Sequence, residues 1–251
     1  MKKWLVRLLL GLVVLIILAS VSIHFFLDSA IKRGVETVGP MLAKVEIKLE
    51  SVSLSLLSGA GKIKGLVVGN PEGFKTPSAI QVSTASLSLQ PSSLLGDKVV
   101  IHSINVQGPE ITYETDLKNS NLKRILANLD ESTGGGQAAP TSPSGKPARK
   151  LQVDDFVLSG AKWHLSVSVM GGHTATLSLP DIHLTGLGQG PDGITPAELT
   201  KKVLQAIEKD AAQAASGAMA DLGKSAGALG QQAGKAAESV TKDIGNLFKK
   251  K

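Results

Sequence analysis

The sequence predicts a mainly β protein with helices. An N-terminal transmembrane helix is expected first, then a curled antiparallel β-sheet that forms a groove, and then a long C-terminal amphipathic helical segment. Three patterns in the 251 residues support this class. An apolar run near the N-terminus is long enough to cross a membrane, apolar and polar residues alternate through the middle of the chain, and the apolar period becomes three to four residues near the C-terminus.

The N-terminal apolar run extends from Leu8 to Leu27 and follows Lys2, Lys3 and Arg7. At about 1.5 Å per residue, a helix of this length spans the roughly 30 Å hydrocarbon core of a bilayer. Because the basic residues precede the run and Asp28 follows it, the positive-inside rule predicts a cytoplasmic N-terminus. We therefore expect a single-pass protein of the inner membrane, with its main body in the periplasm.

A cleaved signal peptide is the competing interpretation, because basic residues also precede the apolar part of such peptides. Ala19 to Ser22 supplies the small residues of a possible cleavage site. The chain nevertheless stays apolar as far as Leu27, which favours an uncleaved anchor.

The rest of the chain divides by its apolar period and composition. A period of two predicts eight or nine antiparallel strands, on both sides of a stretch of Gly, Pro, Ser and Ala that has too little to bury to become ordered. The expected segments are a cytoplasmic N-terminus (1–7), the transmembrane helix (8–27), a juxtamembrane helix (28–43) that Pro40 should end, a first groove part (44–130), a disordered linker (131–150), a second groove part (151–188) and an Ala/Gly-rich amphipathic helix (194–251).

Two local features of the first groove part are expected to shape its strands. The alternation slips by one residue between Leu49 and Val52, which predicts a bulge or corner at Glu50 and Ser51. The stretch GLVVGNPEGF places a turn directly after a strand, with Pro71 to preset φ and Gly73 to relieve the exit. This stretch is expected to be one hairpin turn in a series.

The C-terminal segment starts on clear helix signals. Thr195 is the expected N-cap, Pro196 the first helical residue, and Glu198 the partner of Thr195 in a capping box. The first apolar stripe of this helix consists of Leu199, Val203 and Ile207. Such a helix could cover the open sheet or lie on a membrane, and both remain open at this point.

The apolar side of the strands contains few aromatic residues, which make up only 3% of the chain. A closed sandwich with an aliphatic core is one interpretation. The other is an open trough whose aliphatic inner face contacts lipid acyl chains.

The order of features resembles the AsmA-like family of envelope proteins. The resemblance rests on the N-terminal anchor followed by VEIKLESVSLSLLSGAGKIKGLVVGNPEGF, PSAIQVSTASLSLQPSSLL and DKVVIHSINVQGPEITYE. It implies a β-groove that binds lipid acyl chains, with a role in phospholipid handling or outer-membrane homeostasis. The expected groove residues are Ile63, Val67, Ile80, Val82, Leu87, Leu89, Val99, Ile101, Ile104, Val106, Leu165, Val167, Leu177 and Leu179.

This chain is short compared with the large members of that family. Nine strands at about 4.8 Å spacing give a sheet roughly 40 Å wide, too narrow to bridge an envelope unaided. The expected partners are therefore membrane lipids, with other envelope proteins or further copies of the chain. The alternative function is a membrane-tethered scaffold with a closed core and a protein partner.

The sequence gives little support for other chemistry. The net charge of +6 is spread along the chain, which favours a membrane surface over nucleic acid. Asp181 and His183 could form half a metal site but lack two further ligands. Asp154 and Asp155 are adjacent and so are expected on opposite faces of a strand, which argues against a paired-carboxylate site. We expect no enzyme activity, no cofactor and no metal.

Overall fold

The structure, a computed structural model, describes residues 26–116, 118–133, 149–167, 173–218 and 220. Apart from Phe26 and Leu27, the predicted transmembrane helix lies outside these residues, as does most of the predicted linker. Within the described ranges, none of the helices combines the length and the hydropathy that crossing a membrane requires. The chain divides into two units, Met1–Glu208 and Lys209–Lys251, and the described part of the second is helical over 209–218.

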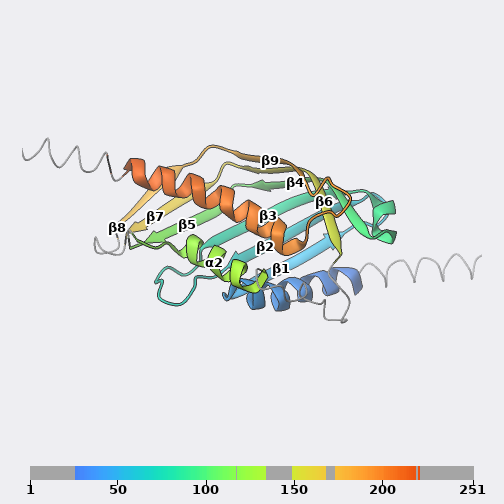
Figure 1. Cartoon of the computed structure of the whole chain (residues 1–251), viewed down its shortest axis with the longest axis horizontal. Coiled ribbons are helices and arrows are strands. Elements are labelled where there is room, and N and C mark those ends of the chain that lie inside the picture. Colours follow the sequence, from blue (N-terminus) through green and yellow to red (C-terminus); the bar gives the residue numbers. More distant parts are fainter. Residues whose placement is uncertain (1–25, 117, 134–148, 168–172, 219, 221–251) are drawn as a thin grey trace, which may run out of the picture. The chain divides into compact units, whose positions relative to one another are not determined.

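The first unit is built on a sheet of nine strands (Figure 1). In chain order they are β1 (Ile47–Leu54), β2 (Ala60–Val68), β3 (Ile80–Leu89), β4 (Lys98–Gln107), β5 (Glu110–Thr115), β6 (Lys150–Ser159), β7 (Lys162–Val167), β8 (His173–Ser178) and β9 (Ile182–Leu187). A helix over 26–43 precedes them, the 3-10 helix η1 (Pro91–Leu95) joins β3 to β4, α2 (Asn121–Thr133) follows β5, and a last helix begins at 196.

The nine strands occupy only six positions across the sheet, because some of them continue one another. β3 pairs with β5 through its first residues and with β4 through its second half. β4 and β5 then pair with β6 and β7 at one constant offset of 52 residues, from Lys98 with Lys150 to Thr115 with Val167. β9 and β8 complete this side, and β1 and β2 complete the other.

Each long strand is interrupted at a glycine in the left-handed region of φ. Gly108 has φ of 56° between β4 and β5, and Gly160 has φ of 63° between β6 and β7. The hydrogen bonds between the two long strands continue past these glycines, since the Gly108 amide donates to the Ser159 carbonyl at 2.8 Å. The Lys162 amide likewise donates to the Pro109 carbonyl at 2.9 Å. The interruptions are thus aligned kinks in continuous strands rather than hairpin turns.

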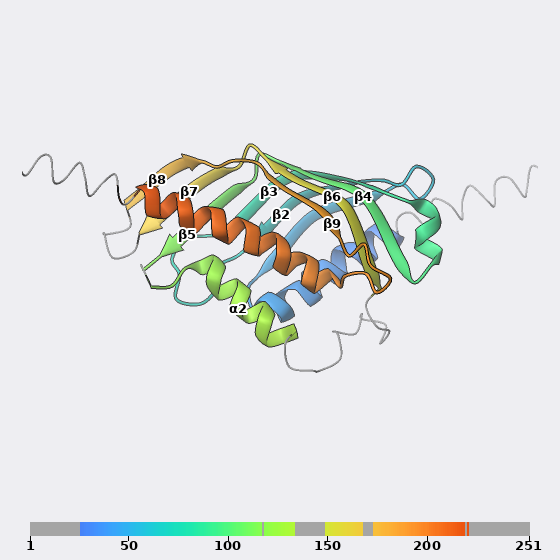
Figure 2. The same cartoon turned by 45° about the horizontal axis from the view of Figure 1, so that its top comes forward.

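Two features of the expected sheet are wrong. The sheet is mixed, because β4 pairs with β6 and β5 with β7 in parallel. The connection of 34 residues between Thr115 and Lys150 includes α2 and is long enough to return the chain to the same end of the sheet. Moreover, the sheet is not curled into an open trough: α2 and the part of the last helix that belongs to the first unit, residues 196–208, lie over one of its faces (Figures 1 and 2).

The helix over 26–43 protects the edge strand β1, which pairs on one side only. Glu36 accepts the Leu49 amide at 2.9 Å, and Asp28 accepts the Leu54 amide at 3.0 Å. Lys32 donates to the carbonyls of Leu49 and Glu50. These side chains satisfy groups that an exposed edge would otherwise offer to another strand.

α2 packs through the stripe expected from its periodicity, whereas in the last helix Leu199 and Val203 are only half-buried and the buried residues include Ala197, Leu204 and Ile207. In α2, Leu122, Ile125 and Leu129 are at most 2% exposed. The last helix starts with the predicted capping box: the Glu198 amide donates to the Thr195 hydroxyl at 3.1 Å, and the Thr195 amide donates to the Glu198 carboxylate at 2.7 Å. That backbone amide is the main reason why the pKa of Glu198 lies below its ordinary value.

Three boundaries differ from the expected ones. Pro40 does not end the first helix, which continues to residue 43 and stops where Lys44 takes a φ of 52°. The expected linker is shorter at both ends, because α2 extends to Thr133 and β6 begins at Lys150. The irregularity expected at Glu50 does not shift the β1–β2 register. Gly65, with φ of 60°, lies opposite Glu50 in β2, so both strands are distorted at the same place and the pairs on either side keep their register.

The NPEGF stretch lies in a long loop, residues 69–79, rather than in a tight hairpin turn. A β-turn does form within it, from Pro71 to Phe74. The loop is fastened by Glu114 of β5, whose side chain is buried. The Glu114 carboxylate accepts the amides of Lys75 at 3.0 Å and Thr76 at 2.8 Å.

Asn121, the first residue of α2, takes the place of a missing strand beside β5. Its side-chain oxygen accepts the Glu114 amide at 3.1 Å, and its side-chain nitrogen donates to the Thr112 carbonyl at 2.8 Å. These are the two bonds that a neighbouring peptide group would make. The same side chain accepts the Leu122 amide at 2.9 Å and donates to the Asn70 side chain at 2.8 Å. It therefore links the loop, the sheet and α2.

Candidate functional site

One face of the sheet is apolar across all six strand positions. Directly paired residues of neighbouring strands project to the same face, so the register identifies its members. One continuous row across the sheet consists of Leu54, Gly61, Leu87, Ile104, Phe156 and Leu184. This apolar face is the one that α2 and the last helix cover in part (Figure 2).

The apolar face is buried at one end and half-open at the other. Around β5 and β7, Ile111 is fully buried and Trp163 is only 2% exposed. Towards η1, Leu87, Ile101 and Ile104 are all half-buried. The apolar side chains at the β5–β7 end are thus buried as in an ordinary core, while those at the η1 end remain half-buried.

The register brings most of the expected groove residues onto this face. The members that lie there and are buried are Ile80, Val82, Leu89, Val106, Leu165 and Val167. The members that lie there and are half-buried are Ile63, Leu87, Val99, Ile101 and Ile104. The half-buried set, which we call the open patch, lies on three adjacent strands, β2, β3 and β4.

Three expected residues are not placed on the apolar face. Val67 pairs with Lys48 and Gln81, and so lies on the opposite face, because the chain distorts at Gly65. Leu177 belongs to β8, but its side chain lies outside the described residues. Leu179 follows β8 in the connection to β9 and is half-buried.

Further half-buried residues extend the apolar face beyond the expected set. They are Val52, Leu66, Leu151, Leu184 and Leu187. Val52, Leu151 and Leu184 have the apolar period of their strands, whereas Leu66 lies in a run of three apolar residues and Leu187 is one position out of phase. What the sequence does not show is that these side chains are only half-buried at this end of the sheet.

Comparison with known proteins identifies the family. Residues 1–174 match the sequence model of the AsmA family, which is more than half of the chain. The chain belongs to the AsmA family. No curated protein and no solved structure matches it significantly.

Membership of the AsmA family has consequences for location and class. It implies a protein of the cell envelope and suggests a role in envelope or outer-membrane biogenesis. AsmA proteins are generally not enzymes. The matched residues include the whole open patch.

The other face of this AsmA sheet is polar and carries two histidine–aspartate pairs. His102 lies 3.1 Å from Asp154, and His183 hydrogen-bonds Asp155. Both aspartates lie on this face, so the expectation of opposite faces is wrong. The strand slips between Val153 and Phe156, which both lie on the apolar face.

The aspartates of the polar face are held by separate polar neighbours rather than gathered into one cluster. Hydrogen bonds from Gln152 first, and then from His102, hold the pKa of Asp154 below its ordinary value, so this carboxylate stays ionised. Asp181 accepts the Gly160 amide at 3.0 Å instead of joining His183. The structure as described contains no group of three or more metal-ligating side chains.

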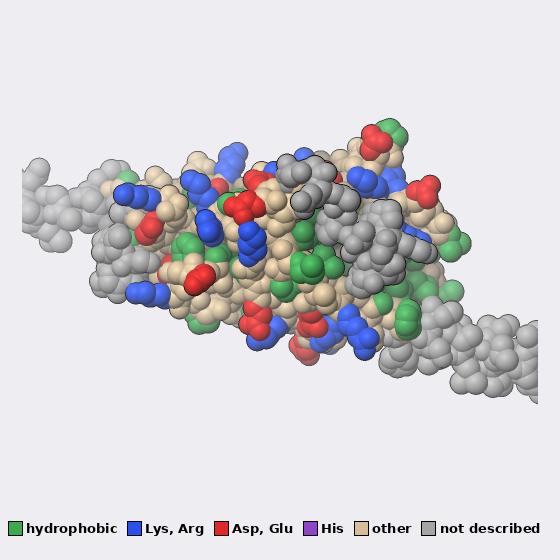
Figure 3. All heavy atoms as spheres, turned by 60° about the horizontal axis from the view of Figure 1, so that its bottom comes forward, with side chains coloured by type: hydrophobic (Ala, Val, Ile, Leu, Met, Phe, Trp, Pro, Cys, Tyr) green, Lys and Arg blue, Asp and Glu red, His purple; other side chains and the backbone are tan. Residues whose placement is uncertain are grey.

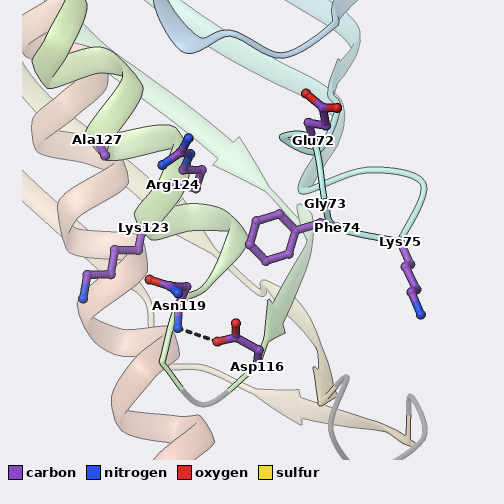
Figure 4. Close-up of a pocket in the computed structure, with 9 residues that line it drawn as sticks. All are labelled: Glu72, Gly73, Phe74, Lys75, Asp116, Asn119, Lys123, Arg124 and Ala127. Atoms are coloured by element: carbon purple, nitrogen blue, oxygen red, sulfur yellow. Dashed lines mark hydrogen bonds between the residues drawn. The ribbon is translucent and has the colours of Figure 1, made fainter.

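A hollow of about 460 Å³ lies between the 69–79 loop and the start of α2 (Figure 4). Lys123 and Arg124 line it together with Glu72 and Asp116, so charges of both signs surround the Phe74 ring. Backbone hydrogen bonds, the strongest from Asn119 at 2.6 Å, hold the pKa of Asp116 below its ordinary value. This mixed lining is unsuited to an acyl chain, and the hollow lies at the opposite end of the sheet from η1.

Proposed function

We propose that this AsmA-family protein binds the acyl chains of phospholipids on the open patch, as an inner-membrane-anchored periplasmic protein of phospholipid handling or outer-membrane homeostasis. The observation that carries the proposal is the set of half-buried aliphatic side chains on adjacent strands, Ile63, Leu87, Val99, Ile101 and Ile104. Each Å² of apolar surface left in water costs about 25 cal/mol, so a ligand that covers the patch is favoured.

An acyl chain fits the chemistry of this surface. The patch is aliphatic and offers non-directional contact rather than hydrogen bonds. It is also limited in extent, because six strand positions at about 4.8 Å give a sheet roughly 29 Å wide. Such a surface suits the loading or shuttling of single lipids, and a continuous path between two membranes would need partner proteins or further copies.

Ile104→Asp is expected to remove bound phospholipid, with Asn105→Asp as the matched control. The two residues are adjacent and half-buried, but only Ile104 lies on the apolar face. An ionised carboxylate in the patch must lose water when an acyl chain binds, and we expect at least about a tenfold loss of occupancy, equivalent to about 1.4 kcal/mol.

The measurement is native mass spectrometry of the full chain purified in detergent, followed by lipid extraction. Lipid around the membrane anchor is the same in both variants, so the difference between them reports the patch. Equal phospholipid content in the two folded variants would count against the proposal.

A membrane-tethered scaffold is the second candidate, favoured by the closed packing around Ile111 and Trp163. On that account the patch completes a core against a partner protein. The wild-type chain would then carry no phospholipid beyond that of its anchor.

A further inference from the structure

The most exposed large apolar side chains of the described residues gather at one end of the sheet. Leu57 in the β1–β2 turn is 97% exposed, Leu95 at the end of η1 is 92% exposed, and Phe26 is 78% exposed. Among the described residues, Met41 is the fourth exposed large apolar residue, and it lies near the C-terminal end of the first helix. Figure 3 shows hydrophobic side chains at the surface of this end, on the right, and others among charges of both signs over the rest of the face in view.

The β1–β2 turn and η1 are held against each other. The Leu89 amide donates to the Gly59 carbonyl at 2.9 Å, just before η1 begins. Gly59 has φ of 72°, and a Cβ there would lie 2.0 Å from the Leu89 carbonyl oxygen. The two turns therefore form one rigid projection, which presents Leu57 and Leu95 together; we call it the apolar tip.

The apolar tip lies where the chain emerges from its predicted membrane segment. The described part of the first helix starts at Phe26, inside the apolar run that ends at Leu27, and Asp28 accepts the Leu54 amide beside the β1–β2 turn. Figures 1 and 2 both place the start of this described part, the turn and η1 at the same end. A bilayer that holds the preceding residues is thus the surface nearest to the tip.

The composition of the tip also suits a bilayer. Residues 55–59 and 91–96 contain no charged side chain. Arg149 hydrogen-bonds the Leu94 carbonyl and remains exposed, which sets a cation beside the apolar residues at the depth of lipid headgroups. Asp97 lies just beyond η1 and is expected to stay in water.

We propose that the apolar tip, formed by Leu57 and Leu95, inserts into the same bilayer that anchors the chain. This contact would orient the sheet with its η1 end at the membrane, whether or not the open patch binds lipid. It assigns to the two turns a membrane-docking role that the anchor alone does not supply.

The test uses the absence of cysteine from the chain. A spin label is attached to Leu57→Cys or Leu95→Cys in the full chain, reconstituted into vesicles of phosphatidylethanolamine and phosphatidylglycerol. The control is Lys118→Cys, an exposed residue in the turn between β5 and α2 at the opposite end of the sheet. Collision rates with oxygen, which concentrates in the bilayer, are compared with those of a water-soluble nickel chelate.

We expect an oxygen-to-nickel ratio several-fold higher at Leu57 and Leu95 than at Lys118. Because both leucines are almost fully exposed, labelling them leaves the fold intact. Ratios equal to that of Lys118, with all three labels in water, would overturn the proposal. A bilayer-like ratio at Lys118 as well would also overturn it, because the protein would then lie along the membrane instead of docking by this end.

Discussion

Replacing Asn121 with alanine is expected to lower the free energy of unfolding by about 2–4 kcal/mol. The side chain is fully buried and makes four hydrogen bonds, two of them to the open side of β5. Alanine would remove this partner from the buried Glu114 amide and from the half-buried Thr112 carbonyl. The loop held by Asn70 would also lose its link to the sheet.

Thermal unfolding of the full chain in detergent, followed by near-ultraviolet circular dichroism, measures this effect. For a protein of this size each kcal/mol shifts Tm by about 2–4 °C, so the loss corresponds to a fall of roughly 5–15 °C. Asn121→Asp loses both donors and sets a buried carboxylate against the Thr112 carbonyl and the Asn70 side-chain oxygen, so it should be no more stable than alanine. Lys118→Ala, at an exposed position nearby, is the control. A Tm for Asn121→Ala equal to that of this control would show that the amide does not replace a strand.

Gly59→Ala should be almost as damaging, with an expected loss of about 2–4 kcal/mol. Part of the cost arises from φ of 72°, which an L-residue with a Cβ adopts at roughly 1–2 kcal/mol. The rest arises from the Leu89 carbonyl, which the new Cβ would approach to 2.0 Å. Because that atom is backbone, the β1–β2 turn must move away from η1.

Gly108→Ala is the matched control for this substitution. Gly108 has φ of 56°, but no atom lies within 4 Å of the position that a Cβ would take, so only the backbone conformation opposes alanine there. Chemical denaturation of both variants should therefore give a larger loss for Gly59→Ala, by at least about 1 kcal/mol. Equal losses would mean that the two turns are not held together, and the apolar tip would not be a rigid unit.

The strands and the apolar face follow largely from residue alternation. The alternation changes phase between Leu49 and Val52, and both residues nevertheless lie on the apolar face. The paired strand β2 changes phase at the same place, as the pairs Leu49–Leu66 and Val52–Ile63 show. Val67 was assigned wrongly because residues 66–68 are all apolar, so alternation does not decide which of them faces inward. There the φ of Gly65 determines the face, and sequence alone does not reveal it.

The alternation of apolar and polar residues predicts neither the relative direction of paired strands nor polar contacts between residues far apart in the sequence. Alternation is the same in parallel and antiparallel strands, and so the parallel pairing of β4 with β6 was missed. In the sequence, Asn121 is an ordinary residue near the start of a helix. Its partner Asn70 lies 51 positions away, so no local pattern connects the two. The half-buried state of the patch around Ile104 depends on which distant segments pack over it, and no local period encodes that.

The central claim, that lipid acyl chains occupy the open patch, is tested most directly by photo-crosslinking in living cells. A benzophenone amino acid is placed at Ile101 or at Val100, two adjacent half-buried residues on opposite faces of β4. Mass spectrometry of the purified full chain then identifies the adducts. Phospholipid adducts at Ile101 and not at Val100 are the predicted result. Absence of lipid at Ile101, or equal adducts at both positions, would contradict the account.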